Sequence, residues 1–235
     1  MRHVREIAAA MALTIAAGTA DASVVGALGN GVGLGSSAGQ DFQIGITEDT
    51  RVQGWDEAQN VTVASNSVRV DYLLGSNFAH GDSLTGLSTV SPTPQYLPAG
   101  TYASDLIRYD PVGAAGSTSG ATFTFGGEII GIIVSNYGSA QLLAASDSVF
   151  GLAVAFDTFV PASLPAGTGR RSEDEDRFSV AASGTRITIG AMGARGGHID
   201  EIRVITAAPA PVPVPGAGLL LLGAIGILAA RRRKA

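Results

Sequence analysis

The sequence predicts an all-β fold, an antiparallel two-sheet sandwich that is jelly-roll-like, followed by a C-terminal hydrophobic helix. Two observations lead to this fold class. Apolar and polar residues alternate along many short segments, which is the period of half-buried strands. Glycine and proline separate these segments, and no stretch of about 12 residues shows the 3.6-residue period of a helix. We therefore expect any helix within the domain to be short.

The expected strands follow one another along the chain. Alternation predicts half-buried strands over residues 42–46, 61–63, 68–72, 123–125 and 187–189. Continuous apolar character predicts central strands, covered on both faces, over residues 129–134 and 149–156. Residues 201–206 close the domain as a last strand. Glycine and proline predict loops over residues 91–94, 98–100, 113–120, 161–169 and 193–197.

The chain is expected to divide into one domain and several targeting segments. These are a signal peptide (1–22), a β-sandwich extracellular domain (23–206), a Pro/Ala hinge with a sorting motif (207–215), a transmembrane sorting helix (216–230) and a basic cytoplasmic tail (231–235). The domain is long enough to bury a core. It holds nine arginines against 18 acidic residues, a formal charge of −9. This charge disfavours nucleic acid and anionic membranes as partners.

The N-terminus has the three parts of a secretory signal peptide. Arg2 and Arg5 precede an apolar stretch over residues 7–17, and Ala20 and Ala22 are the small residues that signal peptidase requires. We expect cleavage after Ala22. The absence of cysteine from the chain also suits an oxidising compartment.

The C-terminus combines a proline-rich hinge, a short apolar run and a basic cluster. Residues 216–230 reach roughly 22 Å as a helix, whereas a bilayer core of about 30 Å takes about 20 residues. The run is expected to insert if Val212 and Val214 enter the interface. A basic cluster follows directly and predicts a cytoplasmic tail with the domain outside; it consists of Arg231, Arg232, Arg233 and Lys234.

The string VPVPGAGLLLLGAIGILAARRRKA resembles the PEP-CTERM class of bacterial sorting signals, in its VPLPA-type variant. Val214 stands where the pattern has leucine, and Gly216 stands where it has alanine. The resemblance implies processing by an exosortase-type membrane peptidase of Gram-negative bacteria, often alongside exopolysaccharide production. Without processing, the helix would remain as an anchor. The processing motif maps to Val212, Pro213, Val214, Pro215 and Gly216.

The domain resembles a group of exported PEP-CTERM proteins of unknown function. The resemblance spans most of the domain, and it implies no catalytic residues because none is established for that group. It is carried by WDEAQNV (55–61), LIRYDPVG (106–113), EIIGIIVS (128–135), ASDSVFG (145–151) and the segments 176–180 and 200–206.

Four adjacent carboxylates form the densest charge cluster of the domain: Glu173, Asp174, Glu175 and Asp176. Carboxylate oxygens are calcium ligands, but the spacing matches no EF-hand loop. Neighbouring arginines favour a solvated loop that neutralises its own charge. We therefore expect no cofactor, with Ca²⁺ as the weaker alternative.

The sequence contains only weak matches to the residue patterns of catalytic, zinc-binding and dinucleotide-binding sites. His80 and His198 are the only histidines of the domain, which makes a zinc site improbable. Although His198 precedes Asp200 by two residues, no Gly-x-Ser-x-Gly elbow accompanies them. Residues 29–35 are rich in glycine but lack a surrounding βαβ unit, so we expect a flexible linker there.

A sugar site is the main alternative function. Trp55 and Asp56 place an aromatic ring beside a carboxylate, as lectin-like sandwiches do, although a lone tryptophan is more often part of a core. Tyr96, Tyr102 and Tyr109 are further aromatic candidates.

These features predict a non-enzymatic surface or extracellular-matrix protein with a structural or adhesive role. A glycan-binding module, with or without calcium, is the alternative, and a polysaccharide hydrolase ranks third. The expected partners are signal peptidase, an exosortase-type peptidase, the membrane and exopolysaccharide.

Overall fold

The computed structural model describes eight segments of the chain, all within one compact unit, Asp21–Pro209. They are residues 24–29, 32–34, 52–85, 93–109, 115–134, 142–150, 176–195 and 200–208. The predicted signal peptide, sorting helix and basic tail lie outside them, as does the strand expected over residues 42–46. Within these segments, no helix is long and apolar enough to cross a membrane.

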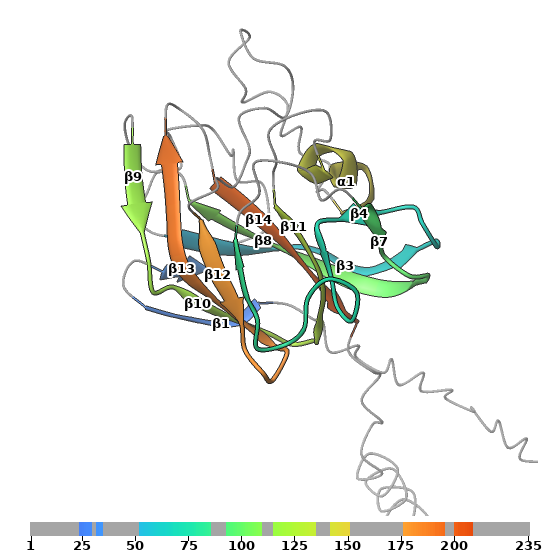
Figure 1. Cartoon of the computed structure of the whole chain (residues 1–235), viewed down its shortest axis with the longest axis horizontal. Helices are drawn as coiled ribbons and strands as arrows, with labels where there is room; N and C mark the ends of the chain where they lie inside the picture. Colours follow the sequence, from blue (N-terminus) through green and yellow to red (C-terminus); the bar gives the residue numbers. More distant parts are fainter. Residues whose placement is uncertain are drawn as a thin grey trace, which may run out of the picture. The chain divides into compact units, whose positions relative to one another are not determined.

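The first sheet has the strand order β1-β10-β13-β12-β6, and β9 pairs with the far half of β13. The strand pairs of this sheet are all antiparallel among the described residues. Its strands are β1 (Val24–Leu28), β6 (Ser83–Thr85), β9 (Ala115–Thr118), β10 (Thr122–Phe125), β12 (Arg177–Val180) and β13 (Arg186–Arg195). These strands are coloured from blue to orange in Figure 1.

The second sheet has the strand order β2-β3-β8-β14-β11-β5 and contains the longest strands. Its pairings are antiparallel except that of β2 with β3. Its members are β2 (Val32–Leu34), β3 (Val52–Val63), β5 (Tyr72–Leu73), β8 (Gly100–Tyr109), β11 (Ile129–Val134) and β14 (Asp200–Ala207). A separate small ribbon pairs β4 (Arg69–Val70) with β7 (Gln95–Tyr96). This β-rich, mainly antiparallel structure confirms the predicted all-β class.

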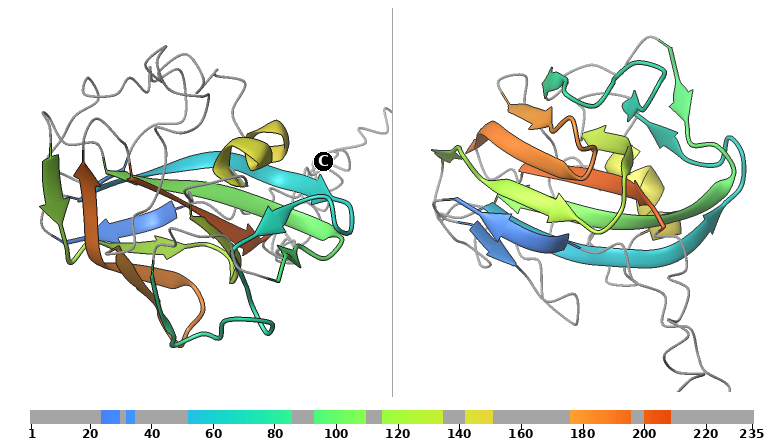
Figure 2. Two further views of the ribbon diagram at one scale, coloured as in Figure 1. Left: turned by 45° about the horizontal axis from the view of Figure 1, so that its top comes forward. Right: turned by 90° about the horizontal axis from the view of Figure 1, so that it is seen from below.

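Side chains from both sheets meet in one hydrophobic cluster, and Figure 2 shows the two sheets from two further directions. The first sheet contributes Phe123 and Ile187, and the second contributes Ile107 and Ile132. Gly54 of β3 lets the sheets approach closely, because a Cβ at this position would lie 2.7 Å from the Phe123 ring. Burial of these side chains is the main source of stability for the domain.

The opposite face of the second sheet is also covered. The helix α1 (Leu142–Phe150) contacts β3, β11 and β4, and its apolar residues Leu142, Leu143 and Phe150 are buried there. Trp55, Leu106 and other side chains of the sheet complete this second cluster. In Figure 1, α1 lies beside the β4–β7 ribbon. We call this side of the second sheet the outer face.

Several expectations from the sequence are wrong in detail. The strand expected over residues 149–156 begins in α1, because a continuous apolar run has no period that separates strand from buried helix. The linker expected over residues 29–35 contains β2, which is held by parallel pairing with β3. The loops expected over residues 113–120 and 193–197 contain β9 and the end of β13, which pair with each other. Backbone pairing overrides the glycine content there.

A charged residue in the cluster between the sheets should prevent folding. We expect Ile132→Asp to lose the β-type far-ultraviolet circular dichroism spectrum, because Ile132 is fully buried and an unpaired carboxylate there costs several kcal/mol. The total stability of a domain is only about 5–15 kcal/mol. Leu28→Asp is the matched control, since Leu28 is 70% exposed. A native spectrum for Ile132→Asp would contradict the core assignment.

Candidate functional site

The outer face of the second sheet carries an unusual concentration of buried polar side chains. Along β14, Glu201 and Arg203 share this face because side chains alternate along a strand. From β8, Ser104 and Arg108 reach the same face, at positions paired with Ile205 and Glu201 of β14. All four residues are at most 1% exposed. A buried charge is costly unless it is paired and hydrogen-bonded, so the partners of these groups define the site.

A β-bulge places Glu57 in this cluster. Asp56 of β3 lies opposite Asp105 and Ala58 lies opposite Ser104, so β3 has one extra residue at Glu57. Bulges re-aim side chains and often lie beside functional sites. Here the carboxylate of Glu57 is 4% exposed and accepts a hydrogen bond of 2.7 Å from the Ser104 hydroxyl.

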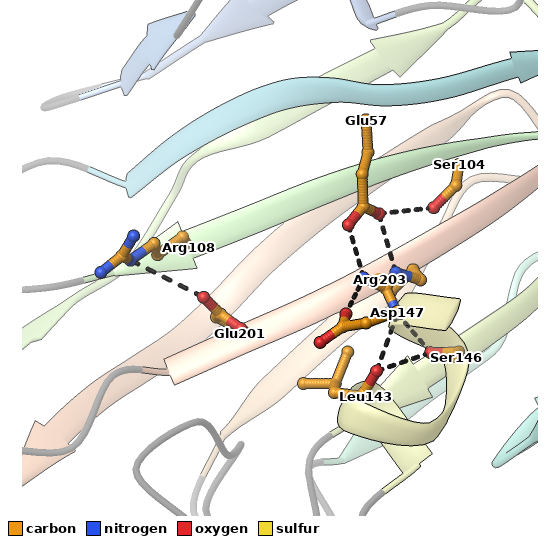
Figure 3. Close-up of polar contacts among 8 residues, drawn as sticks. All are labelled: Glu57, Ser104, Arg108, Leu143, Ser146, Asp147, Glu201 and Arg203. Atoms are coloured by element: carbon orange, nitrogen blue, oxygen red, sulfur yellow. Dashed lines mark hydrogen bonds and ion pairs between the residues drawn. The ribbon is translucent and has the colours of Figure 1, made fainter. Parts of the chain in front are cut away.

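Arg203 is the centre of the cluster and uses all five of its N–H donors. Nε and Nη2 form a two-pronged ion pair with the Glu57 carboxylate, at 2.7 and 2.5 Å. Nη2 also donates to Asp147 Oδ1 at 2.6 Å, and Nη1 donates to the Leu143 carbonyl at 2.9 Å and to the Ser146 hydroxyl. Figure 3 shows the guanidinium between Glu57 and α1. Arginine suits this position because its planar fork matches a carboxylate.

A second ion pair lies next to Arg203 on the same face. Arg108 Nε is 3.7 Å from Glu201 Oε1, and both side chains are 1% exposed. The two residues lie directly opposite each other on β8 and β14 (Figure 3). Glu201 and Arg203 are two residues apart on one strand, so the two ion pairs follow each other along β14.

The arrangement around Arg203 is suited to holding structure together. With five donors engaged inside the domain, the guanidinium has no N–H left to offer a ligand. Its partners come from β3 and from three residues of α1 that lie one helical turn apart, namely the Leu143 carbonyl, Ser146 and Asp147. The cluster therefore ties α1 to the middle of the second sheet.

A small cavity of about 130 Å³ adjoins this cluster. Arg69 and Tyr96 of the β4–β7 ribbon line one side, and Ser146 of α1 lines the other; Ser67, Val68, Leu142 and Ala145 complete the wall. Tyr96 is 39% exposed. The Ser146 hydroxyl donates to the Leu143 carbonyl and accepts from Arg203, so the cavity and the cluster share one group. The volume corresponds to about four water molecules.

Another buried carboxyl lies at the edge strand β5. Asp71 is 1% exposed, and its Oδ2 accepts a hydrogen bond of 2.8 Å from the Val134 N–H. Burial raises the pKa of Asp71 from 3.8 to about 7, although this hydrogen bond and the charge of Arg69 lower it. Because the folded-state pKa lies above the ordinary value, the protonated carboxyl stabilises the fold. This contribution is full below about pH 4 and is lost as the pH rises through 7.

The structure separates the two residues of the sugar site predicted from the sequence. Trp55 is 4% exposed and belongs to the outer-face hydrophobic cluster, the alternative that the sequence had left open. Asp56 is half-buried and binds the Val24 N–H at 2.8 Å. Tyr102 and Tyr109 are buried, so Tyr96 is the one of the four aromatic candidates with an exposed ring beside a cavity.

Of the four predicted metal ligands, only Asp176 lies among the described residues. It is 1% exposed, and its Oδ1 accepts a hydrogen bond of 3.0 Å from the Gly193 N–H. Asp176 is thus buried at the start of β12 and is not part of a solvated loop. Within the described segments, no three histidine or acidic side chains gather in a way that would hold a metal ion. Glu173, Asp174 and Glu175 lie outside those segments.

The other predicted functional residues are accounted for as follows. His80 is part-buried, and its ring lies 3.2 Å from the Ile129 carbonyl and 3.7 Å from Glu128. Asp200 is fully buried, whereas His198 lies outside the described residues. The signal-cleavage, sorting-motif and basic-tail residues also lie outside them.

Sequence reasoning missed the Arg203 cluster. One signal was present: Glu201 and Arg203 interrupt an apolar strand at alternate positions, as Arg108 does in β8. Buried strands rarely carry charges unless the charges are paired. The partner Glu57 could not have been found this way, since the bulge that aims it depends on its pairing with β8.

Comparisons with known proteins identify no relative. No protein-family model matches the chain, and neither a curated protein nor a solved structure is significantly similar to it.

The Arg203 cluster should tolerate no change of donor geometry. We expect Arg203→Lys to lower the free energy of unfolding by roughly 3–5 kcal/mol, because lysine cannot form the fork and leaves buried carboxylate oxygens unpaired. Urea unfolding measures this. Arg186→Lys is the matched control, since Arg186 is exposed and should change stability by less than about 0.5 kcal/mol. Equal effects of the two variants would contradict the role given to Arg203.

Proposed function

We propose that this chain is an exported, non-enzymatic surface or extracellular-matrix protein whose C-terminal sorting signal is processed by an exosortase-type membrane peptidase. The order of hinge, apolar run and basic cluster over residues 207–234 carries the proposal. The signal-peptide pattern at the other end supports it independently. In this account the apolar run spans the inner membrane until the peptidase releases the domain.

The domain fits a passive role on the outside of a cell. The Arg203 cluster is its most distinctive set of polar residues, and the hydrogen bonds of this cluster hold α1 to the sheet. We further propose that the two large sheets form a jelly-roll-like sandwich. In support, the chain alternates between the sheets: β5 is followed by β6, β8 by β9, and the next strand after β11 is β12, each pair divided between the two sheets. Such crossing is typical of jelly rolls.

Processing predicts defined ends for the mature protein. Mass spectrometry of protein purified from its native host should give an N-terminus at or near Ser23 and a C-terminus between Ala207 and Gly216. Recovery of an intact basic tail on the extracellular form would contradict the proposal. Changing both Pro213 and Pro215 to alanine should retain the tail, because the motif is lost. Pro209→Ala, in the hinge before the motif, is the control that should still be processed.

A glycan-binding role is the second candidate, and the cavity beside Tyr96 favours it. A tyrosine ring offers an apolar face, while its hydroxyl, the Arg69 guanidinium and the Ser67 hydroxyl offer hydrogen-bonding groups. These are the elements of a small polar-ligand site. The volume suits one edge of a sugar ring better than a whole oligosaccharide. Exopolysaccharide, with many such edges, would bind through repeated weak contacts.

This second role predicts that binding depends on Tyr96. On a glycan array, Tyr96→Ala should reduce the signal of any bound glycan at least tenfold, because it removes the apolar platform, with or without calcium. Leu28→Ala, at the other large apolar residue that is exposed in the described segments, is the control and should bind as the wild type does. A glycan signal that survives Tyr96→Ala would place the sugar site elsewhere and rule out the cavity.

A further inference from the structure

Two carboxyl groups face each other between β3 and β8. Asp105 is fully buried and lies directly opposite Asp56, which is half-buried. Ser104 and Leu106, on either side of Asp105, belong to the outer face, so Asp105 belongs to the face toward the first sheet. The side chains of Asp56 and Asp105 are hydrogen-bonded to each other. Ionised carboxylates have only acceptors, so this hydrogen bond requires a proton on one of the two.

The carboxyl pair also holds the first strand of the domain. The Val24 N–H of β1 donates a hydrogen bond of 2.8 Å to Asp56 Oδ1, and it is hydrogen-bonded to Asp105 as well. Val24 pairs with Phe125 of β10 in the first sheet, whereas both carboxyls come from the second sheet. Within the described segments, β10 is the only strand that pairs with β1. The carboxyl pair is therefore a polar connection between the sheets, at a strand with ladder hydrogen bonds on one side.

The surroundings of Asp105 favour its protonated form. Burial raises the pKa of the Asp105 carboxyl well above 3.8. The charge and the hydrogen bond of Asp56 raise it further, as does the charge of Glu57, whereas the hydrogen bond from the Val24 N–H lowers it. Two like charges close together in a buried site repel each other. One proton therefore stays between the two carboxyls at pH values where an ordinary aspartate is ionised.

The neighbouring strands, as far as they are described, bring no cation to the pair. Val204 of β14 lies opposite Asp105, and β1, β2 and β10 contain no titratable side chain. Asp200, another acid of β14, lies further along the strand, opposite Tyr109. Arg186 of β13 is exposed, and the two buried arginines of the second sheet belong to its outer face. A second negative charge at the pair would thus be uncompensated, which is costly in a buried site.

We propose that Asp56 and Asp105 share one proton and that this proton fastens β1 to the second sheet. With the proton in place, Asp105 donates to Asp56, and Asp56 accepts from the Val24 N–H. When base carries the proton away to solvent, two carboxylates face each other and repel. As an edge strand that contacts β3, β1 can then move away and let water surround Asp105. The first strand is therefore held at low pH and released at high pH.

The first test measures the pH dependence of urea unfolding for the full chain in detergent. Because the folded-state pKa of Asp105 is raised, its protonated carboxyl contributes stability that is full below about pH 3.8 and is lost as the pH rises through the raised value. Across this range Asp105 alone should raise the unfolding equilibrium constant about tenfold per pH unit, because the folded chain holds one proton more than the unfolded chain. Asp105→Asn should remove this dependence, since its amide donates to Asp56 at any pH. The matched control is Asp71→Asn, which should remove only the contribution that ends at about pH 7.

Hydrogen–deuterium exchange tests whether β1 is the strand that is released. After correction for the intrinsic exchange rates, the amides of β1 should lose about tenfold in protection per pH unit as Asp105 ionises, while those of β13 stay protected. In Asp105→Asn the amides of β1 should keep their protection over the same range.

A second variant keeps the test informative if Asp105→Asn folds poorly. Asp56→Asn also gives the pair a permanent N–H donor, now from β3, and should hold β1 at high pH in the same way. Infrared spectroscopy reports the proton itself: Asp105→Asn should lower the carbonyl band of protonated carboxyl groups at pH values where an ordinary aspartate is ionised. An unchanged band, or a loss of β1 protection that neither variant prevents, would overturn the proposal. Equal loss of protection in all strands of the wild type would also overturn it, because the proton would then stabilise the whole fold and not the attachment of β1.

Discussion

The position of α1 depends on the charged fork between Arg203 and Glu57. Arg203 lies near the middle of the second sheet with no exposure, and it satisfies five donors with groups from β3 and α1. Because breaking one side of a buried pair leaves the other charge unsatisfied, the fork allows only one placement of the helix. The helix in turn covers Trp55, Leu106 and Ile133 on the outer face.

The two faces of the second sheet contribute to the stability of the domain in different ways. The face toward the first sheet is mainly apolar, with Asp56, Asp105 and Asp200 among its few polar residues, and it contributes hydrophobic burial that is not directional. The outer face combines apolar packing with two ion pairs, whose geometry is directional. Hydrophobic burial therefore accounts for most of the stability, while the polar groups select one arrangement of α1 and the β4–β7 ribbon.

Part of this structure could be predicted from the sequence. The alternation at Phe123 and Phe125 and at Ile187 and Ile189 identified β10 and β13, and the apolar run at 129–134 identified β11. Of the longest strand, β3, only the end at residues 61–63 was predicted, because its two bulges, at Glu57 and before Val61, break the alternation. Likewise, Val149 and Phe150, the last two residues of α1, were expected to begin a strand, since a short apolar run does not distinguish helix from strand.

The candidate site was harder to predict than the fold, because it depends on contacts between residues that are far apart in the sequence. Trp55 offered an aromatic signal in the sequence, but its burial depends on α1, which lies about 90 residues further along the chain. Arg203 and Glu57 are 146 residues apart, and a single sequence does not reveal such a pairing.

The role of Arg203 in positioning α1 is tested most directly by hydrogen–deuterium exchange in Arg203→Met, which removes the fork but keeps an apolar side chain of similar length. We expect the amides of Leu142–Phe150 to lose protection while those of β10 and β13 stay protected; unchanged protection of α1, or an equal loss in all strands, would contradict the central role of Arg203.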